Sequence, residues 1–471
     1  MLRPLSAGAA LFFLVLIQLI FRLQFGPGGV LAEADSAKFV RVALEGGCPH
    51  TPLFPLYTLL LRFFTHFKFI DEPGANLSLL SAILVSLGCV FLWDALSRRF
   101  KDRFFTFFAV LAMSFLPFIV TAATEVTPVS LSFCLFFFAY AVFVNESVPL
   151  YLKFIPCGLL AFHDPLALWF FALLFPFAAL YFFRVGKCKD FFAGTALGIA
   201  CGLLPYLYAV ASFQRGESCE YLRREDFWKS LFCAVLNGQF WSNYFVMPPS
   251  SWPMRLADLG RSFLASAALP LFAAPILLLG LFLRKTERFL SFELATFFAA
   301  LLAALLFIIP CYVFYPLQWF WLLEAYLAIF LACSFLYICR SEAMRPVLCP
   351  LLFLGVLVLF AHSFKKAPER RNSFEAAKLA QAFGALTHGS VLVTGDVYTD
   401  GEYYRYHLAA HPKLVAKNVA VMDEVVTGKR NFFISPVVKG YLEEQGVPFH
   451  LVSDVDGLAV YELGEKTDGE E

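Results

Sequence analysis

The sequence predicts an α-helical multi-pass membrane protein with about eleven transmembrane helices and a small α/β domain at its C-terminal end. Of its 471 residues, 60% are hydrophobic and 15% are charged, and the mean hydropathy is +0.70. A soluble domain is about half apolar and about a quarter charged. The apolar residues also form blocks near the length of about 20 that crosses a bilayer, and basic residues gather in alternate loops.

The apolar blocks define the expected membrane helices. They cover residues 9–24, 77–97, 104–121, 127–144, 150–162, 166–183, 191–212, 262–283, 291–309, 317–338 and 346–363. The fifth block is short and ends at His163-Asp164-Pro165, which predicts a tight turn at the membrane boundary. Blocks five and six therefore form either two helices or one broken hairpin.

Basic residues in the short loops predict the orientation of the helices, because Lys and Arg favour the cytoplasmic side. Four clusters fall on one side if the helices alternate. They are Arg98, Arg99, Lys101 and Arg103; Arg184, Lys187 and Lys189; Arg284, Lys285 and Arg288; and Arg340 with Arg345. The short loops near Glu125, His163 and Pro316 contain no Lys or Arg and fall on the other side. The N-terminus is then expected in the cytoplasm.

This orientation divides the chain into two domains. Residues 1–363 form the transmembrane domain, with outside loops at about 25–76 and 213–261, and residues 364–471 form an extracytoplasmic domain. The last segment is polar and mixed in composition. Its apolar runs at 390–394, 431–435 and 458–461 predict strands, and residues 373–383 and 437–445 predict helices.

The composition argues against two classes of function. The net charge is +1, so no overall field favours nucleic acid. The 12 cysteines lie mostly inside apolar blocks, and no CxxC pair or His/Cys spacing of a zinc site is present. We therefore expect no metal site.

The first outside loop places polar side chains close to the membrane. Asp35 and Ser36 come soon after the first expected membrane exit, and residues 38–44 predict a short helix along the interface. A carboxylate here can take a proton from an acceptor hydroxyl. It can equally cap the interfacial helix, as Asp often does. The residues alone leave both interpretations open.

The second half of this loop is rich in proline and aromatic residues. Pro52 and Pro55 restrict the backbone and favour an extended turn. Tyr57 suits the headgroup boundary. His50 can donate a hydrogen bond to a lipid phosphate, whose negative charge grows in the transition state.

Three further places carry candidate side chains. Glu125, at a helix end, either marks the boundary or is a functional carboxylate, because ionisable groups at membrane depth often serve function. His163 is either an oriented imidazole beside an aspartate or part of a hydrogen-bonded turn before a proline. Arg223 and Arg224, in the second long loop, either bind a phosphate or form a solvated loop face.

These motifs together resemble a known family. The first loop carries Asp35-Ser36, an intervening helix, and then His50-x-Pro52-x-x-Pro55-Leu56-Tyr57. This pattern is similar to that of bacterial multi-spanning proteins related to the eukaryotic transmembrane O-mannosyltransferase of plexin-type receptor domains, which belong to the GT-C superfamily. Further matches follow in order: Thr124-Glu125-Val126, Phe162-His163-Asp164-Pro165-Leu166, Phe227-Trp228 with Asn237-Gly238-Gln239-Phe240, and Thr394-Gly395-Asp396.

The resemblance implies an inverting glycosyltransferase at the extracytoplasmic face. Its donor is a polyprenyl-phosphate sugar, with mannose as the candidate sugar, its acceptor is a hydroxyl on protein or glycan, and it requires no cofactor. Asp35 and Glu125 are the expected catalytic carboxylates. The expected contacts to the donor phosphate or substrate are His50, His163, Arg223, Arg224 and Tyr57. The closer match to bacterial members implies the inner membrane, with the site facing the periplasm.

One departure keeps other functions open. The family's Asp-Ser-Gly-Glu becomes Asp35-Ser36-Ala37-Lys38, which reverses a charge. Either the catalytic role rests on Asp35, or the chain is a membrane scaffold without activity. A lipid or sugar transporter is the third alternative. It would need polar residues near the bilayer midplane and broken helices, whereas the block centres here are almost purely apolar.

Overall fold

The structure is a computed structural model. It describes residues 34–46, 54–71, 73–213, 391–394, 415–418, 431–433, 436–455 and 458–464, together with scattered helical positions between 8 and 20 and between 302 and 361. The expected helices at 262–283 and 373–383 and residues 214–261 of the second long loop lie outside the described residues, and of the expected helix at 291–309 only Leu302 is described.

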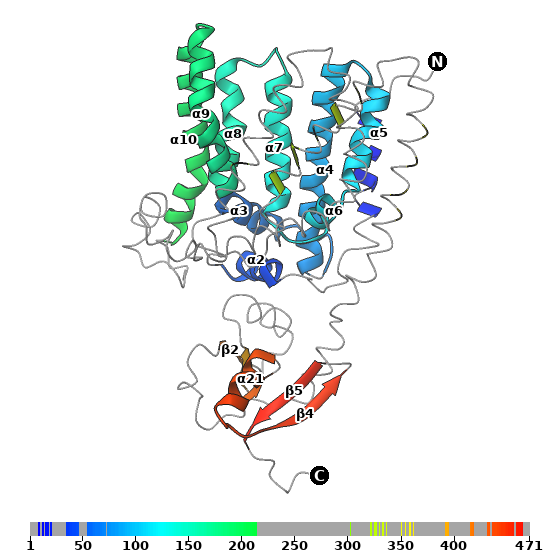
Figure 1. The fold of residues 1–471 in the computed structure, drawn as a ribbon, viewed down its shortest axis with the longest axis vertical. Coiled ribbons are helices and arrows are strands. Elements are labelled where there is room, and N and C mark those ends of the chain that lie inside the picture. Colours follow the sequence, from blue (N-terminus) through cyan, green and yellow to red (C-terminus); the bar gives the residue numbers. More distant parts are fainter. Residues whose placement is uncertain are drawn as a thin grey trace.

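A bundle of upright helices forms the main body (Figure 1). In chain order the helices are α4 (Pro73–Phe100), α5 (Arg103–Ser114), α6 (Pro117–Thr124), α7 (Val129–Val144), the 3-10 turn η1 (Leu150–Lys153), α8 (Phe154–His163), α9 (Pro165–Arg184) and α10 (Cys188–Phe213). Within the described residues, Pro73–Phe100 and Leu166–Arg184 are long and apolar enough to cross a membrane, and shorter apolar helices accompany them.

The single helix expected over 104–121 is wrong, because the structure divides it. α5 ends at Ser114 and α6 begins at Pro117. Proline has no backbone N–H and disfavours helical geometry in the residue before it. Leu116 accordingly has extended backbone angles, φ −62° and ψ 136°. Proline is favoured at the first position of a helix, so Pro117 starts α6.

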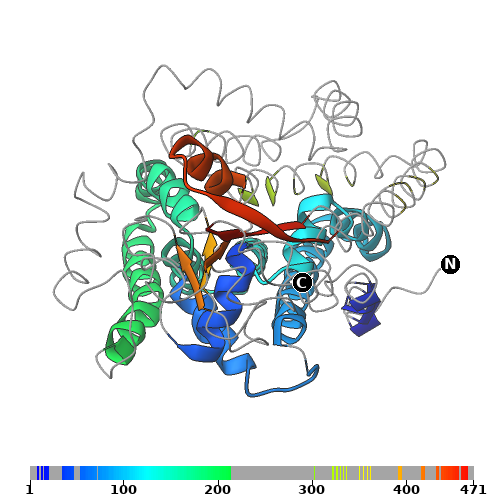
Figure 2. The same ribbon diagram turned by 90° about the horizontal axis from the view of Figure 1, so that it is seen from below.

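Two short helices lie at one end of the bundle, α2 (Ala34–Glu45) and α3 (Pro55–Phe64) (Figures 1 and 2). α2 includes the interfacial helix expected at 38–44. The extended turn expected at Pro55 is wrong, because Pro55 is the first residue of α3 and the turn is made by Phe54, whose φ is 71°. α3 buries Tyr57, Leu61 and Phe64 on one face.

Glycines bring α8 and α10 into backbone contact. Gly194, Gly198 and Gly202 follow one another at four-residue spacing along α10, so they share one helix face. A Cβ added at Gly198 would lie 2.5 Å from the carbonyl oxygen of Phe154 in α8. A Cβ at Gly202 would lie 2.5 Å from the carbonyl oxygen of Gly158. Small residues with this spacing are typical of closely packed membrane helices.

The C-terminal segment contains a five-stranded sheet in the order β2-β1-β3-β5-β4. The strands are β1 (Val391–Thr394), β2 (Val415–Asn418), β3 (Asn431–Phe433), β4 (Phe449–Val455) and β5 (Leu458–Leu463), and α21 (Pro436–Glu444) follows β3. β1 pairs in parallel with β2 and β3, whereas β5 pairs antiparallel with β3 and β4. The runs expected as strands at 390–394, 431–435 and 458–461 coincide with β1, β3 and β5, while β2 and β4 were not predicted.

Candidate active site at one end of the bundle

Polar side chains are buried together at the bundle end that carries α2 and α3. They come from α3, α4, the α6–α7 connection, α7 and the α8–α9 turn, and none is more than 5% exposed. We call them the polar cluster: Tyr57, Ser81, Glu125, Ser130, Ser132, His163 and Asp164. Burying polar groups costs free energy unless each finds a partner, so the partners decide what the cluster can do.

Tyr57 lies at the centre of the cluster, where α3 meets α4 and α7. Its hydroxyl oxygen is 3.1 Å from the Ser81 hydroxyl oxygen, and the Ser130 hydroxyl also reaches it. Burial raises the pKa of the Tyr57 phenol above its usual range, and the nearby Glu125 carboxylate adds to the rise. The phenol therefore stays neutral and can donate a hydrogen bond. The Tyr57 side chain is fully buried by protein.

Glu125 ends α6. Its backbone is extended, with φ −100° and ψ 157°, and its N–H donates to the Thr121 carbonyl oxygen at 3.0 Å. The side chain is 5% exposed. The C-terminus of a helix carries partial negative charge, so a carboxylate there is electrostatically disfavoured. The helix dipole therefore does not stabilise Glu125 at this position.

His163 ends α8 and is 1% exposed. Its Nε2 lies 3.1 Å from the Pro128 carbonyl oxygen. A carbonyl only accepts hydrogen bonds, so Nε2 carries the proton and Nδ1 of the neutral ring is the acceptor. Among the described residues, Nδ1 has no hydrogen-bond partner. The ring is held from its side by the Phe54 ring, with centroids 5.5 Å apart. His163 can therefore accept one more hydrogen bond at Nδ1.

Asp164 forms the start of α9 rather than orienting the neighbouring imidazole. Its Oδ1 accepts from the N–H groups of Leu166 at 2.9 Å and Ala167 at 3.4 Å. Its Oδ2 accepts from the Ser132 hydroxyl at 2.9 Å. This is an N-cap tied to α7. Of the two interpretations of His163-Asp164, the hydrogen-bonded turn is the one observed, with the imidazole bonded to a distant carbonyl.

The remaining predicted site residues are only partly placed. Asp35 is the second residue of α2, and its side chain lies outside the described part of the chain. α2 reaches the cluster through Phe39, whose ring centroid is 5.4 Å from that of Tyr57. His50, Arg223 and Arg224 lie outside the described residues. The structure thus brings Tyr57, Glu125 and His163 to one end of the bundle, next to α2, the helix that contains Asp35.

The sequence analysis missed the serines. Ser81, Ser130 and Ser132 supply the side-chain hydroxyls that Tyr57 and Asp164 use. The available signal was their position, since each lies toward the outer end of an apolar block. Within the described residues, no group of three or more His, Cys, Asp or Glu side chains is arranged to hold a metal ion.

Comparison with solved structures identifies the fold that carries this site. No family model and no curated protein matches the sequence. Two solved structures of ArnT from Cupriavidus metallidurans do match in structure, each at 12% identity. The structure bound to undecaprenyl phosphate gives a TM-score of 0.60 over 98% of each chain. The apo structure gives 0.55 over 97% of this chain and 98% of the other. The chain has the GT-C fold.

The shared fold covers almost the whole chain, so it is the fold of a multi-pass membrane protein. The fold implied by the resemblance to the GT-C superfamily is therefore confirmed. At 12% identity the likeness concerns the fold, and the roles of individual residues in this chain rest on their own geometry.

Proposed function

We propose that this chain is a membrane glycosyltransferase that moves a sugar, with mannose as the first candidate, from a polyprenyl-phosphate donor to a hydroxyl on a protein or glycan. The observation that carries this proposal is the polar cluster, in which Glu125, His163 and Tyr57 are buried at one end of a GT-C bundle. Undecaprenyl phosphate bound to the similar ArnT structure supports a polyprenyl phosphate as the donor lipid.

The position of the cluster supports an extracytoplasmic site. The connections at 100–103 and 185–187 lie at the bundle end opposite α2 and α3 (Figure 1), and both are flanked by several basic residues. Basic loops favour the cytoplasm. The cluster then faces the periplasm, as do the loops 25–76 and 213–261 and the proposed α/β domain at 364–471.

The proposed reaction is a single displacement with inversion. A carboxylate, with Asp35 as first candidate, takes the proton from the acceptor hydroxyl. The hydroxyl oxygen attacks the anomeric carbon, whose bond to the phosphate oxygen breaks, and the electron pair leaves with the polyprenyl phosphate. His50, Arg223 and Arg224 would stabilise the growing phosphate charge. Glu125 is the second carboxylate of the site.

The deciding experiment measures transfer from polyprenyl-phosphate sugars by the purified chain and by Asp35→Asn. Asn retains the size of Asp but cannot accept a proton. Loss of a general base typically lowers the rate by about 10²–10⁴-fold, whereas loss of a carboxylate from the first turn of a helix costs only about 0.3–1 kcal/mol. We therefore expect at least a hundredfold loss of transfer with unchanged thermal stability in detergent.

Asp71→Asn is the matched control, because Asp71 is an exposed carboxylate in the loop before α4, and it should transfer at the wild-type rate. His50→Ala should weaken donor binding as well as slow turnover. Near-full activity of Asp35→Asn would move the base to Glu125 or Asp164. Absence of transfer by the wild-type chain with every polyprenyl-phosphate sugar would favour the inactive scaffold, consistent with Lys38.

A further inference from the structure

A cavity of about 570 Å³ opens at the bundle end opposite the polar cluster, where α7 leads into η1 and α9 turns into α10. This volume lies within the range of about 300–1,000 Å³ that small-ligand sites occupy. Its wall carries four charged side chains, Glu146, Lys153, Lys187 and Asp190, and the apolar or aromatic side chains of Val148, Leu150 and Tyr151. The proposed glycosyl transfer does not use this cavity.

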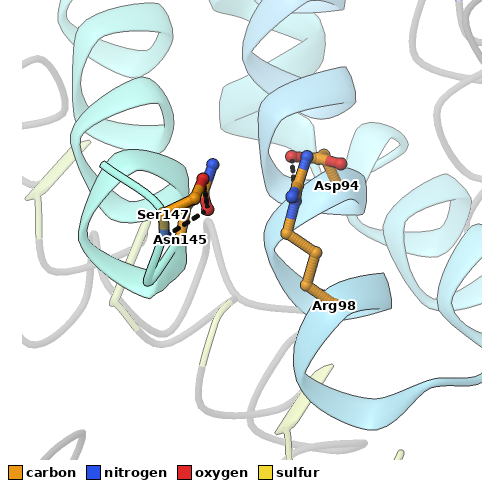
Figure 3. Close-up of polar contacts among 4 residues, drawn as sticks. All are labelled: Asp94, Arg98, Asn145 and Ser147. Atoms are coloured by element: carbon orange, nitrogen blue, oxygen red, sulfur yellow. Dashed lines mark hydrogen bonds and ion pairs between the residues drawn. The ribbon is translucent and has the colours of Figure 1, made fainter.

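A tight turn shapes one side of the cavity. The Asn145 side-chain oxygen accepts from the Ser147 N–H at 3.1 Å and from the Ser147 hydroxyl at 2.7 Å (Figure 3). In such an Asx turn the side chain bonds the backbone two residues further on, which fixes the shape of a short loop. Figure 3 shows the turn together with the Asp94–Arg98 ion pair of α4, in which Arg98 Nε lies 2.8 Å from Asp94 Oδ2. Glu146 lies between Asn145 and Ser147 in the chain, so the turn fixes its position in the cavity wall.

Lys153 supplies a fixed positive charge. Its Nζ donates to the Phe143 carbonyl oxygen at 2.9 Å, which holds the ammonium group at the end of α7. Burial lowers the pKa of Lys153, the Glu146 carboxylate raises it, and the Lys187 ammonium lowers it again. The three side chains are therefore within electrostatic reach of one another.

The charges of the cavity balance, since two ammonium groups stand against two carboxylates. A simple anion would meet the carboxylates, and a simple cation would meet the lysines. A ligand that carries one phosphate and one ammonium group satisfies both pairs. Primary ammonium groups donate hydrogen bonds to carboxylates, and phosphates accept them from lysine.

The surroundings of the cavity indicate a lipid. Large apolar side chains are exposed beside it on α9, η1 and α10, including Leu152, Phe183 and Phe192, which are 37%, 71% and 52% exposed. At the end of a membrane helix, such side chains meet lipid tails and the headgroup boundary. Basic pockets between membrane helices bind the phosphates of lipid headgroups, and here two carboxylates, Glu146 and Asp190, stand beside the two lysines.

We propose that the cavity binds the headgroup of phosphatidylethanolamine, with the phosphate on Lys153 and Lys187 and the primary ammonium on Glu146 and Asp190. The acyl chains then lie along the exposed apolar surface of α9 and α10. This assignment is independent of the proposed glycosyl transfer.

Native mass spectrometry of the purified full chain, with added lipid, tests the assignment. The probes are phosphatidylethanolamine, phosphatidylcholine, whose trimethylated ammonium cannot donate, and phosphatidylglycerol, which has no cation. We expect phosphatidylethanolamine to be retained at least about fivefold better than either, because both its charged groups form charge-assisted hydrogen bonds.

Variants separate the two ends of the headgroup. Glu146→Gln with Asp190→Asn should abolish the preference for phosphatidylethanolamine and increase retention of phosphatidylglycerol. Lys187→Gln should weaken both lipids. Lys189→Gln is the control, because Lys189 is an exposed lysine in the same turn but outside the cavity wall, and it should leave retention unchanged.

Two results would overturn the assignment. Equal retention of the three lipids, or equal effects of Lys187→Gln and Lys189→Gln, would show that the cavity does not select the headgroup. Displacement of bound phosphatidylethanolamine by soluble phosphoethanolamine at comparable concentration would show that a soluble zwitterion, rather than a lipid, is the ligand.

Discussion

A single methyl group added to α10 should destabilise the bundle and slow the proposed reaction. The perturbation is Gly198→Ala. Gly198 faces α8, and its new Cβ would lie 2.5 Å from the Phe154 carbonyl oxygen. That oxygen belongs to the backbone, so no side-chain rotation relieves the clash. The two helices would have to separate by about 1 Å to reach ordinary contact distance.

The sign of the effect distinguishes packing from helix propensity. Alanine stabilises a helix interior by up to about 1 kcal/mol relative to glycine. Overpacking of a close contact costs about 1–3 kcal/mol. The net expectation is a loss of up to about 2 kcal/mol. Because α8 ends at His163, a shift of about 1 Å should also slow sugar transfer, by up to about a hundredfold.

Thermal or denaturant unfolding in detergent, followed by near-ultraviolet circular dichroism, measures the first effect, and the transfer assay measures the second. Gly440→Ala is the matched control, because it also adds a methyl group to a helical glycine but has no other atom within 4 Å of the new Cβ. It should be neutral or stabilising. Wild-type stability or better for Gly198→Ala would refute the close contact between α8 and α10.

Three further predictions test the site and its orientation. Tyr57→Phe leaves the buried Ser81 hydroxyl without its partner and should cost about 1–3 kcal/mol in unfolding free energy, while a double mutant with Ser81→Ala should lose less than the sum of the two single losses. Asp164→Ala removes the cap of α9 and should cost about 0.5–2 kcal/mol, whereas Asp164→Asn should recover most of it in the same unfolding assay. Thiol labelling in intact cells tests the orientation, in a background lacking Cys48, Cys219 and Cys233, which fall in the expected outside loops. A membrane-impermeant reagent should label Lys68→Cys, in the connection between α3 and α4, but not Arg103→Cys, at the start of α5, and both positions are exposed; the opposite labelling pattern would reverse the orientation.

The sequence predicted three helices to within a few residues. The blocks at 77–97, 166–183 and 191–212 correspond to α4, α9 and α10, each extended by a few residues, although α9 contains Pro176 and α10 contains Pro205. The block at 104–121 failed because its hydropathy is continuous although Pro117 interrupts the backbone hydrogen bonds. Proline also misled the analysis at Pro55, where the local restriction was read as a turn but is equally suited to the first residue of a helix.

The sequence predicted that the candidate site residues lie at the same side of the membrane, but it did not predict which residues they contact. Counting helices placed Glu125 and His163 at the same face, and they do share the polar cluster. The partner of the imidazole was not predictable, because it is the carbonyl of Pro128, 35 residues away, rather than the adjacent carboxylate. Likewise Tyr57 is buried by α4 and α7, which no local pattern around residue 57 reveals. Tertiary packing decides these contacts.

The placement of Glu125 connects the fold with the proposed chemistry. A buried carboxylate at a helix C-terminus is disfavoured by the helix dipole and by loss of water, and it raises the pKa of the neighbouring Tyr57 phenol. In a transferase, the same carboxylate would attract the acceptor hydroxyl and the positive character that develops on the sugar ring as the phosphate leaves. The unfavourable electrostatics of the resting chain are therefore what such a transition state would relieve.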